Sequence, residues 1–502
     1  MITPFQIATF FIYSVAIVLA IYFSTNIAED GAGAFIKILG TMGSLAWILF
    51  GSRIWWVPLF LGIGFGGVFW VGFKVYPQEV ALALALVTVA PAMILQRFWL
   101  RPRRKKLPSV FVILFGYLTV ECLYSCLRSG GSMQGIGGIF RIYFLALWPF
   151  LFVTGFSFYS FSQHIRWGLY ALQRGYLARI SMELATFLMP GFLYLPGINF
   201  VLPGSTLGGF DDLRTAGLGL ALVSLALLFS KRGIYLSRRT FFFPVIQVIR
   251  LLEAVAALLF GGGRFNLIAC FLAIGFALIY ARKWIVVSVL LVVVGGGMGW
   301  INMYPQIIEK LPDRVQRTAS ILILKENAVA MQERLQGSNL WHQRLREIGF
   351  QRWIENPVSF FFGTGVKAFD YTVGQGAGDE LFDRSLENAA NVGGYENGLF
   401  TVLSLTGLVG FALYATLFFQ LIRRIWLLQA VADQDDFGRT LSFYALCQAA
   451  LWIISCYFSG GWPSFELMIL GVAVVYLQER ADEQEISPSP QETIPFHELT
   501  KS

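Results

Sequence analysis

Residues 396–420 read ENGLFTVLSLTGLVGFALYATLFFQ and carry a single charge, at Glu396. A helix of this length spans about 37 Å, which exceeds the roughly 30 Å hydrocarbon core of a bilayer. Similar stretches recur along the chain, because 56% of its 502 residues are hydrophobic and only 14% are charged. A soluble domain carries roughly 25% charged residues. The composition therefore excludes an ordinary soluble enzyme and predicts a polytopic integral membrane protein.

The apolar stretches predict an all-α fold with about fourteen membrane-spanning helices. They lie at 5–23, 34–51, 55–73, 79–97, 108–127, 139–161, 177–197, 214–230, 241–260, 264–281, 284–303, 396–420, 441–458 and 464–478. Residues 162–176 have the pattern of an amphipathic helix on the membrane surface. We expect helices 1–11 in residues 1–303, a large loop in 304–395, helices 12–14 in 396–478, and a disordered polar tail in 479–502.

Basic residues are distributed unevenly over the short loops between these helices. If the N-terminus is cytoplasmic, 21 Lys and Arg residues fall on the cytoplasmic side and four on the opposite side. The positive-inside rule then places both termini in the cytoplasm and loop 304–395 outside. The same distribution accounts for the net charge of +8 without a nucleic-acid partner. Within the loop, residues 316–336 and 340–355 have helical patterns, so we expect it to be partly helical.

Four charged or glycine-rich features fall on the predicted outer side. Charge is costly in lipid, so charged residues at helix ends are candidate functional groups. The four stretches are GGFDDLRTAG (208–217), GGGRFNL (261–267), NPVSFFFGTG (356–365) and GGYENGLFTVLSLTGLVG (393–410).

The order of these features resembles the O-antigen polymerase and ligase family of bacterial membrane glycosyltransferases, over roughly residues 205–425. The matching residues are Arg214 with Gly217, Arg264, Asn356 and Pro357 with Gly363 and Gly365, and Glu396 and Asn397 with Leu399, Gly407 and Gly410. Three departures are Gly263 in place of a serine, a longer stretch between Pro357 and Gly363, and Glu396 where ligases carry a histidine. The last departure favours a polymerase.

The resemblance implies a metal-independent and cofactor-free glycosyl transfer at the outer face of the bacterial inner membrane. The donor would be a glycan on undecaprenyl diphosphate and the acceptor a second lipid-linked glycan, giving an O-antigen, capsule or exopolysaccharide. Membrane lipids and a chain-length regulator would be further partners. Two alternatives stay open: a ligase that transfers the glycan to a lipid A core or a protein, and a membrane transporter or lipid flippase.

Two arginines and one glutamate are the candidate catalytic residues. Arg214 and Arg264 enter helices, where a guanidinium and a helix N-terminus both favour the diphosphate leaving group. Glu396 is the candidate general base, and Asp211 or Asp212 is the second choice. The alternatives are that both arginines anchor at the interface and that Glu396 only stabilises a helix start.

Five further residues are candidate substrate contacts beside Asp211 and Asp212. Tyr395 and Asn397 flank Glu396, and His342, Arg344 and Arg346 lie in the outer loop, where a solvated helix face is the alternative. The five cysteines lie in apolar stretches and the three histidines are scattered, so we expect no metal site. Arg250 and Glu253 are three residues apart and are predicted to form a salt bridge.

Overall fold

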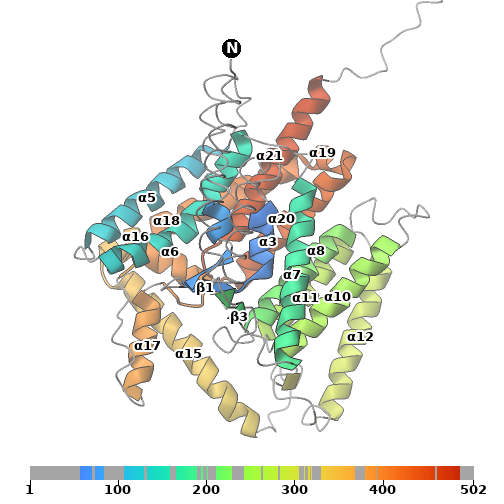
Figure 1. The fold of residues 1–502 in the computed structure, drawn as a ribbon, viewed down its shortest axis with the longest axis horizontal. Helices are drawn as coiled ribbons and strands as arrows, with labels where there is room; N and C mark the ends of the chain where they lie inside the picture. The colour runs from blue at the N-terminus through green and yellow to red at the C-terminus, as the bar shows by residue number, and fades with distance from the viewer. Residues whose placement is uncertain are drawn as a thin grey trace, which may run out of the picture.

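A computed structural model gives the fold of the chain (Figure 1). It describes residues 57–70, 74–77, 79–83, 107–128, 133–158, 165–188, 194–195, 200–201, 211–228, 242–261, 264–280, 283–304, 310, 315–316, 318, 329–367, 379–391, 393–457 and 461–486. The predicted spans at 5–23 and 34–51, most of the span at 79–97, and residues 487–502 lie outside these ranges.

Helices dominate the described residues, and four of them are long and apolar enough to cross a membrane. They belong to α5 (Ser109–Arg128), α6 (Met133–Phe158), α18 (Gly398–Leu427) and α20 (Asp436–Ser455). Shorter apolar helices lie in α8 (Asp211–Leu228), α11 (Arg264–Tyr280) and α12 (Trp284–Met303). Large apolar side chains such as Val112 and Leu127 of α5 are exposed, as lipid contact requires. The chain is a helical membrane protein.

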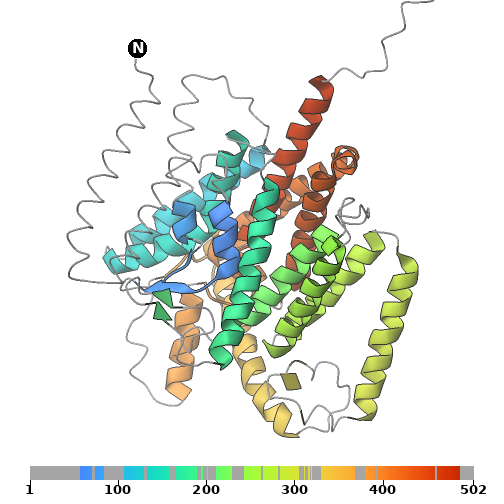
Figure 2. The same cartoon turned by 45° about the vertical axis from the view of Figure 1, so that its right-hand side comes forward.

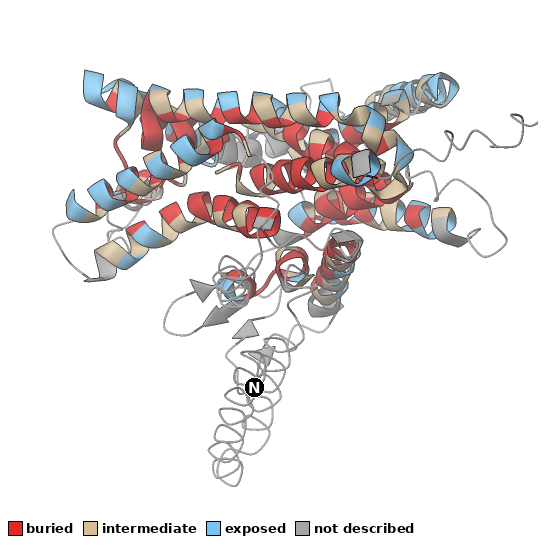
Figure 3. Cartoon of the chain, turned by 90° about the horizontal axis from the view of Figure 1, so that it is seen from above, coloured by how far each residue is buried: buried red, intermediate tan, exposed pale blue. Residues whose placement is uncertain are grey.

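The helices form a bundle in two connected groups (Figure 2). In one group α8 packs against α7 (Ile165–Leu188), α10 (Phe242–Phe260) and α11, and α7 packs against α3 (Val57–Phe65). In the other, α6 packs against α5 and α21 (Ser464–Ile486), while α18 packs against α5 and α21. Helix α20 joins the groups because it contacts both α8 and α21. Buried residues face the inside of this bundle in Figure 3.

Three helices that the structure describes within the predicted loop 304–395 lie at one end of the bundle. They are α15 (Val329–Ile354), α16 (Pro357–Phe362) and α17 (Asp379–Asn391), and Figure 1 shows α15 and α17 extending away from the other helices. Helix α15 joins the stretch predicted at 340–355 to the last residues of the stretch predicted at 316–336. Gln316 and Thr318 are also helical, and residues 319–328 lie outside the described ranges. At the opposite end, α19 (Gln429–Gln434) connects α18 to α20.

Helix α18 is interrupted at Gly407, whose φ of 64° and ψ of −170° are not helical. The segment after α16 packs against the interruption: the Thr364 amide donates to the Ser404 carbonyl at 2.7 Å. The Tyr117 hydroxyl of α5 donates to the Thr406 carbonyl at 2.7 Å. In a continuous helix these two carbonyls would accept hydrogen bonds from amides of the same helix. Backbone polar groups inside a membrane need partners, and Thr364 and Tyr117 provide them here.

A small antiparallel sheet was not predicted by the apolar pattern. Its strands are β1 (Val68–Trp70), β2 (Lys74–Val75), β3 (Tyr194–Leu195) and β4 (Phe200–Val201), in the order β2-β1-β4-β3. The predicted helix at 55–73 is therefore wrong in its second half. Helix α3 ends at Phe65 because Gly66 and Gly67 adopt positive φ angles, which end a helix readily.

The predicted boundary between a surface helix at 162–176 and a span at 177–197 is also wrong. A single helix, α7, runs from Ile165 to Leu188 across that boundary. Arg179 is buried inside it beside Glu183, with Nε 3.4 Å from Oε1, so an internal ion pair makes this helix polar without placing it on the surface. Helix α21 likewise extends to Ile486, so the first residues of the predicted disordered tail are helical.

The predicted salt bridge of α10 is confirmed. Nη1 of Arg250 lies 2.8 Å from Oε2 of Glu253. The two side chains are one helical turn apart, as their spacing indicated.

Candidate functional site

Glu396 has an unusual backbone conformation at the start of α18. Its φ of 50° is positive, and it is the one residue other than glycine with that property within the part of the chain that the structure describes. A left-handed conformation costs a residue with a Cβ roughly 1–2 kcal/mol. Such a conformation persists only where the surrounding structure imposes it, and it is found often at functional sites.

The residues on either side of Glu396 impose this conformation. Tyr395 is 1% exposed, and its hydroxyl lies 2.7 Å from the Ser404 hydroxyl. Asn397 is also 1% exposed and caps α18, because its Oδ1 accepts from the Phe400 amide at 3.0 Å while its Nδ2 donates to the Tyr457 carbonyl. With both neighbours held inside the protein, the Glu396 side chain projects outward and is 52% exposed.

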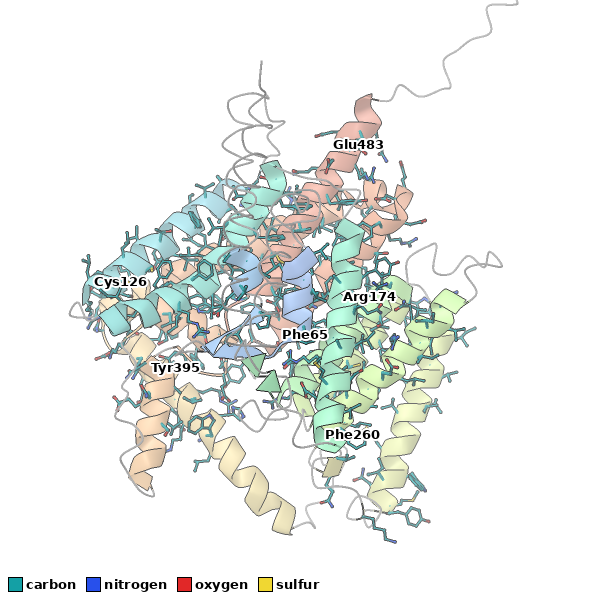
Figure 4. All side chains as sticks on the ribbon, viewed as in Figure 1. Phe65, Cys126, Arg174, Phe260, Tyr395 and Glu483 are labelled. Carbon is teal, nitrogen blue, oxygen red and sulfur yellow. The ribbon has the colours of Figure 1, made fainter. Side chains whose placement is uncertain are left out.

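Tyr395 and Asn397 were predicted to contact substrate, and the structure gives them a different place. Both side chains are buried and hydrogen-bonded within the protein, so we assign them to positioning Glu396. Figure 4 shows Tyr395 at the end of the bundle from which α15 and α17 extend. Burial raises the pKa of Tyr395, which keeps its hydroxyl protonated and able to hydrogen-bond Ser404.

His342 of α15 lies directly beside Glu396. Its Nδ1 is shielded from solvent and is 3.0 Å from Oε2 of Glu396. The helix approaches closely because Gly349 of α15 packs against Tyr395 and Phe400, and a Cβ there would lie 3.0 Å from the Phe400 side chain. The sequence predicted that His342 contacts a ligand or lies on a solvated helix face. Its pairing with Glu396 depends on tertiary packing that no local spacing signals.

The surroundings of Glu396 favour its ionised form. The close approach of His342 is the largest influence and lowers the pKa of Glu396. Partial burial opposes this, but attraction to His342, a hydrogen bond from Trp341 and attraction to Arg214 lower the pKa further. Glu396 is therefore a carboxylate at neutral pH, and Arg214 is close enough to influence it.

Arg214 reaches this site from a third element, the first turn of α8. Its side chain is half-buried. Its backbone packs against Gly261 at the end of α10: a Cβ on Gly261 would lie 2.7 Å from the Arg214 amide nitrogen. The turn that leads to Arg264 therefore begins against the backbone of Arg214.

The structure describes only the backbone of three further candidates, Arg264, Asp211 and Asp212. Arg264 is the first residue of α11, as the sequence predicted. Asp211 is the first residue of α8, three residues before the start predicted at 214, and α8 packs against α11. The side chains of these three residues lie outside the described part of the structure. Their predicted contacts with substrate stay predictions.

The two loop arginines diverge on α15. The guanidinium of Arg346, one turn after His342, lies 5.6 Å from the centre of the Tyr457 ring. Arg344 is exposed and lies on another face of the helix, because it is two residues from His342. The structure brings Arg346 to the side of α15 that carries His342 and leaves Arg344 away from it.

Arg352 and Trp353 of α15 support the site, which their positions in the sequence did not predict. Arg352 donates to Oδ1 of Asn391 at 2.8 Å and hydrogen-bonds Tyr395. The Trp353 ring stacks on Phe360 at 5.1 Å, and its Nε1 donates to the Phe360 carbonyl. These contacts join α15 to α16 and to the turn before Glu396.

Within the described ranges, no group of three or more His, Cys, Asp or Glu side chains is arranged to hold a metal ion. No protein-family model matches the chain, and no curated protein matches it significantly.

Proposed function

We propose that the chain is a glycosyltransferase that polymerises undecaprenyl-diphosphate-linked oligosaccharide repeats at the outer face of a bacterial inner membrane. The observation that carries the proposal is the meeting of Glu396, His342 and Arg214, from three separate elements, at one end of a membrane bundle. An ionised carboxylate beside a cation suits a reaction that removes a proton and releases an anion.

In the proposed reaction, the bond between the sugar C1 and the diphosphate oxygen breaks, and negative charge develops on the diphosphate. Arg214 and Arg264 stabilise that charge, because preorganised cations act most strongly where charge develops. Guanidinium groups also pair with phosphate oxygens through two parallel hydrogen bonds. No metal or cofactor takes part, since the two arginines supply the positive charge.

The new bond forms between C1 of the donor sugar and a hydroxyl oxygen of the acceptor glycan. Glu396 accepts the hydroxyl proton as that oxygen attacks. His342 holds the Glu396 carboxylate, with Nδ1 at 3.0 Å from Oε2, and so fixes the position of the base. The products are the lengthened glycan on its carrier and a free polyprenyl diphosphate.

The proposed topology has about fourteen membrane helices and both termini in the cytoplasm. The segment 304–395 then lies outside, where α15 and α17 cover the site. The position of α15 and α17 at the opposite end of the bundle from α19 (Figure 1) supports this arrangement.

A transporter is a second candidate, and the interruption of α18 at Gly407 favours it. Discontinuous helices bind substrates and ions in many transporters. The transfer reaction fits Glu396 and Arg214 better, because Arg214 lies in the first turn of α8 and Glu396 lies just before α18 rather than at its interruption. A ligase would use the same groups with a different acceptor.

One assay separates the three candidates: the purified chain in detergent or vesicles is supplied with a single lipid-linked repeat. A ladder of longer products supports the polymerase. Transfer that occurs only onto a lipid A core or protein acceptor identifies a ligase, and movement of the lipid across vesicles without transfer identifies a transporter. A folded protein that transfers nothing overturns the proposal.

A further inference from the structure

An apolar groove of about 700 Å³ lies between α11, α12 and α20. None of its lining residues is charged, and α11 contributes Ile268, Phe271, Gly275 and Ile279. Figures 1 and 2 show α12 at the edge of the bundle. Because the groove borders the membrane and has apolar walls, hydrocarbon is favoured over water as its content.

The groove follows the helix face that Arg264 begins. Arg264 opens α11, and Ile268, Phe271, Gly275 and Ile279 follow it by 4, 7, 11 and 15 residues, which is the spacing of one helix face. From 268 to 279 the groove extends for about 17 Å at 1.5 Å per residue. This distance is about half of the roughly 30 Å hydrocarbon core. Arg264 therefore lies about one helical turn before the first groove residue of α11, Ile268.

The outer wall of the groove is accessible from the lipid. Leu291 of α12 lines it and is nevertheless 67% exposed, and the neighbouring Val292 and Val293 are more than half exposed. A chain in the bilayer can thus reach the groove sideways, without passing through the protein. On its other side, α11 packs against α8, which carries Arg214 in its first turn.

We propose that this groove binds the polyprenyl chain of the donor, with its diphosphate at the Arg264 end. This inference rests on the proposed function for the identity of the lipid. A chain held along α11 fixes where the diphosphate sits, so that remote binding positions the sugar for attack. The groove then selects donors by the length of their hydrocarbon chain, while the charged groups act on the head group alone.

Gly275 offers a direct test because a Cβ built on it meets no atom within 4 Å. Gly275→Leu therefore places an apolar side chain in the groove, and its Cβ displaces no neighbour. Gly297→Leu is the matched control, since Gly297 of α12 has equally open surroundings and does not line the groove. The donors are two lipids with the same glycan diphosphate, one on an eleven-unit and one on a two-unit prenyl chain.

We expect the wild type and Gly297→Leu to show a KM for the long-chain donor at least about tenfold below that for the short-chain donor. Gly275→Leu should raise the long-chain KM by about tenfold, remove most of this preference and leave the short-chain KM unchanged. Equal KM values for the two donors in the wild type, or an unchanged preference in Gly275→Leu, would overturn the inference.

Native mass spectrometry with undecaprenyl phosphate separates this inference from the proposed function. Retention of that lipid by the wild type and Gly297→Leu, with at least about tenfold less in Gly275→Leu, supports the groove even if the wild type transfers no sugar. Equal retention in all three proteins contradicts it. Displacement by an equal amount of phosphatidylglycerol also contradicts it, because the groove would then bind any lipid chain.

Discussion

Nδ1 of His342 lies 3.0 Å from Oε2 of Glu396, and this contact joins α15 to the start of α18. The two residues come from separate helices and meet where Glu396 has a left-handed backbone. A carboxylate that is half exposed, ionised and held by an imidazole is a suitable proton acceptor. It also lies near Arg214, whose charge contributes to the low pKa of Glu396.

Substitution of Arg214 tests the stabilisation of the leaving group. Arg214→Ala should lower turnover by roughly 10²-fold or more, because a preorganised charge is lost where negative charge develops. Arg214→Lys should restore only part of the rate, because an ammonium lacks the planar fork of a guanidinium. Steady-state rates with a lipid-linked repeat measure both effects.

Arg344→Ala is the matched control for Arg214. It removes the same charge from an exposed position on α15 and should leave turnover within about twofold of the wild type. Wild-type turnover in well-folded Arg214→Ala would return Arg214 to the role of an interfacial anchor.

The pH dependence of the rate tests whether Glu396 is the base. A glutamate in water has a pKa of about 4.3, and the contacts of Glu396 place its pKa lower. The wild-type rate should therefore hold as pH falls toward that value and decline only below it. Glu396→Gln should lower turnover by about 10²- to 10⁴-fold at every pH.

In His342→Gln the decline should move to higher pH, because the contact with His342 is the largest cause of the low pKa of Glu396. The loss of rate at neutral pH should be smaller than in Glu396→Gln. An equal loss in both variants would make His342 the proton acceptor and Glu396 the group that orients it. An acid decline that stays in place would show that Glu396 does not set it.

Replacement of Glu396 by glycine should separate stability from activity. Glycine adopts positive φ without steric cost, so Glu396→Gly should keep or raise thermal stability, by up to about 1 kcal/mol. The lost pair with His342 is half exposed and contributes little to stability. Turnover should nevertheless fall as far as in Glu396→Gln. A clear loss of thermal stability would mean that the side chain, rather than its neighbours, holds this turn together.

The interruption of α18 depends on Gly407. A Cβ at that position would lie 2.3 Å from the Phe361 carbonyl carbon and oxygen, and φ is 64°. Gly407→Ala should destabilise the protein by about 2 kcal/mol or more, measured by thermal or denaturant unfolding in detergent.

Gly116→Ala is the matched control for Gly407→Ala, because Gly116 of α5 has no atom within 4 Å of an added Cβ. Its stability should change by less than about 1 kcal/mol. Equal stability of the two variants would mean that α18 can become continuous without cost.

The apolar pattern predicted the four described helices that are long and apolar enough to cross a membrane, but not the interruption of α18. Residues 396–420 indicated α18, yet Gly407 is one of several glycines there, and only the approach of Phe361 distinguishes it. Helix α7 was divided at residue 176 in the prediction because its first half is amphipathic, and the buried pair of Arg179 and Glu183 lies in the second half, which was predicted to span the membrane.

The candidate site was predicted in part. Arg214 and Arg264 lie at helix starts as expected, since glycine-rich turns precede both. The contact of Glu396 with His342 could not be predicted, because it arises from the packing of α15 on α18. The burial of Tyr395 and Asn397 could not be predicted either. Both are polar neighbours of the exposed Glu396, and nothing in the local sequence shows that their side chains face inward.

The most direct test of the central claim is a structure of the protein bound to a non-cleavable phosphonate analogue of a polyprenyl-diphosphate-linked sugar. The two phosphorus-bearing groups should lie within ion-pair distance of the guanidinium groups of Arg214 and Arg264, with the sugar facing Glu396. A diphosphate bound elsewhere, or the two guanidinium groups apart with no shared site between them, would contradict the account.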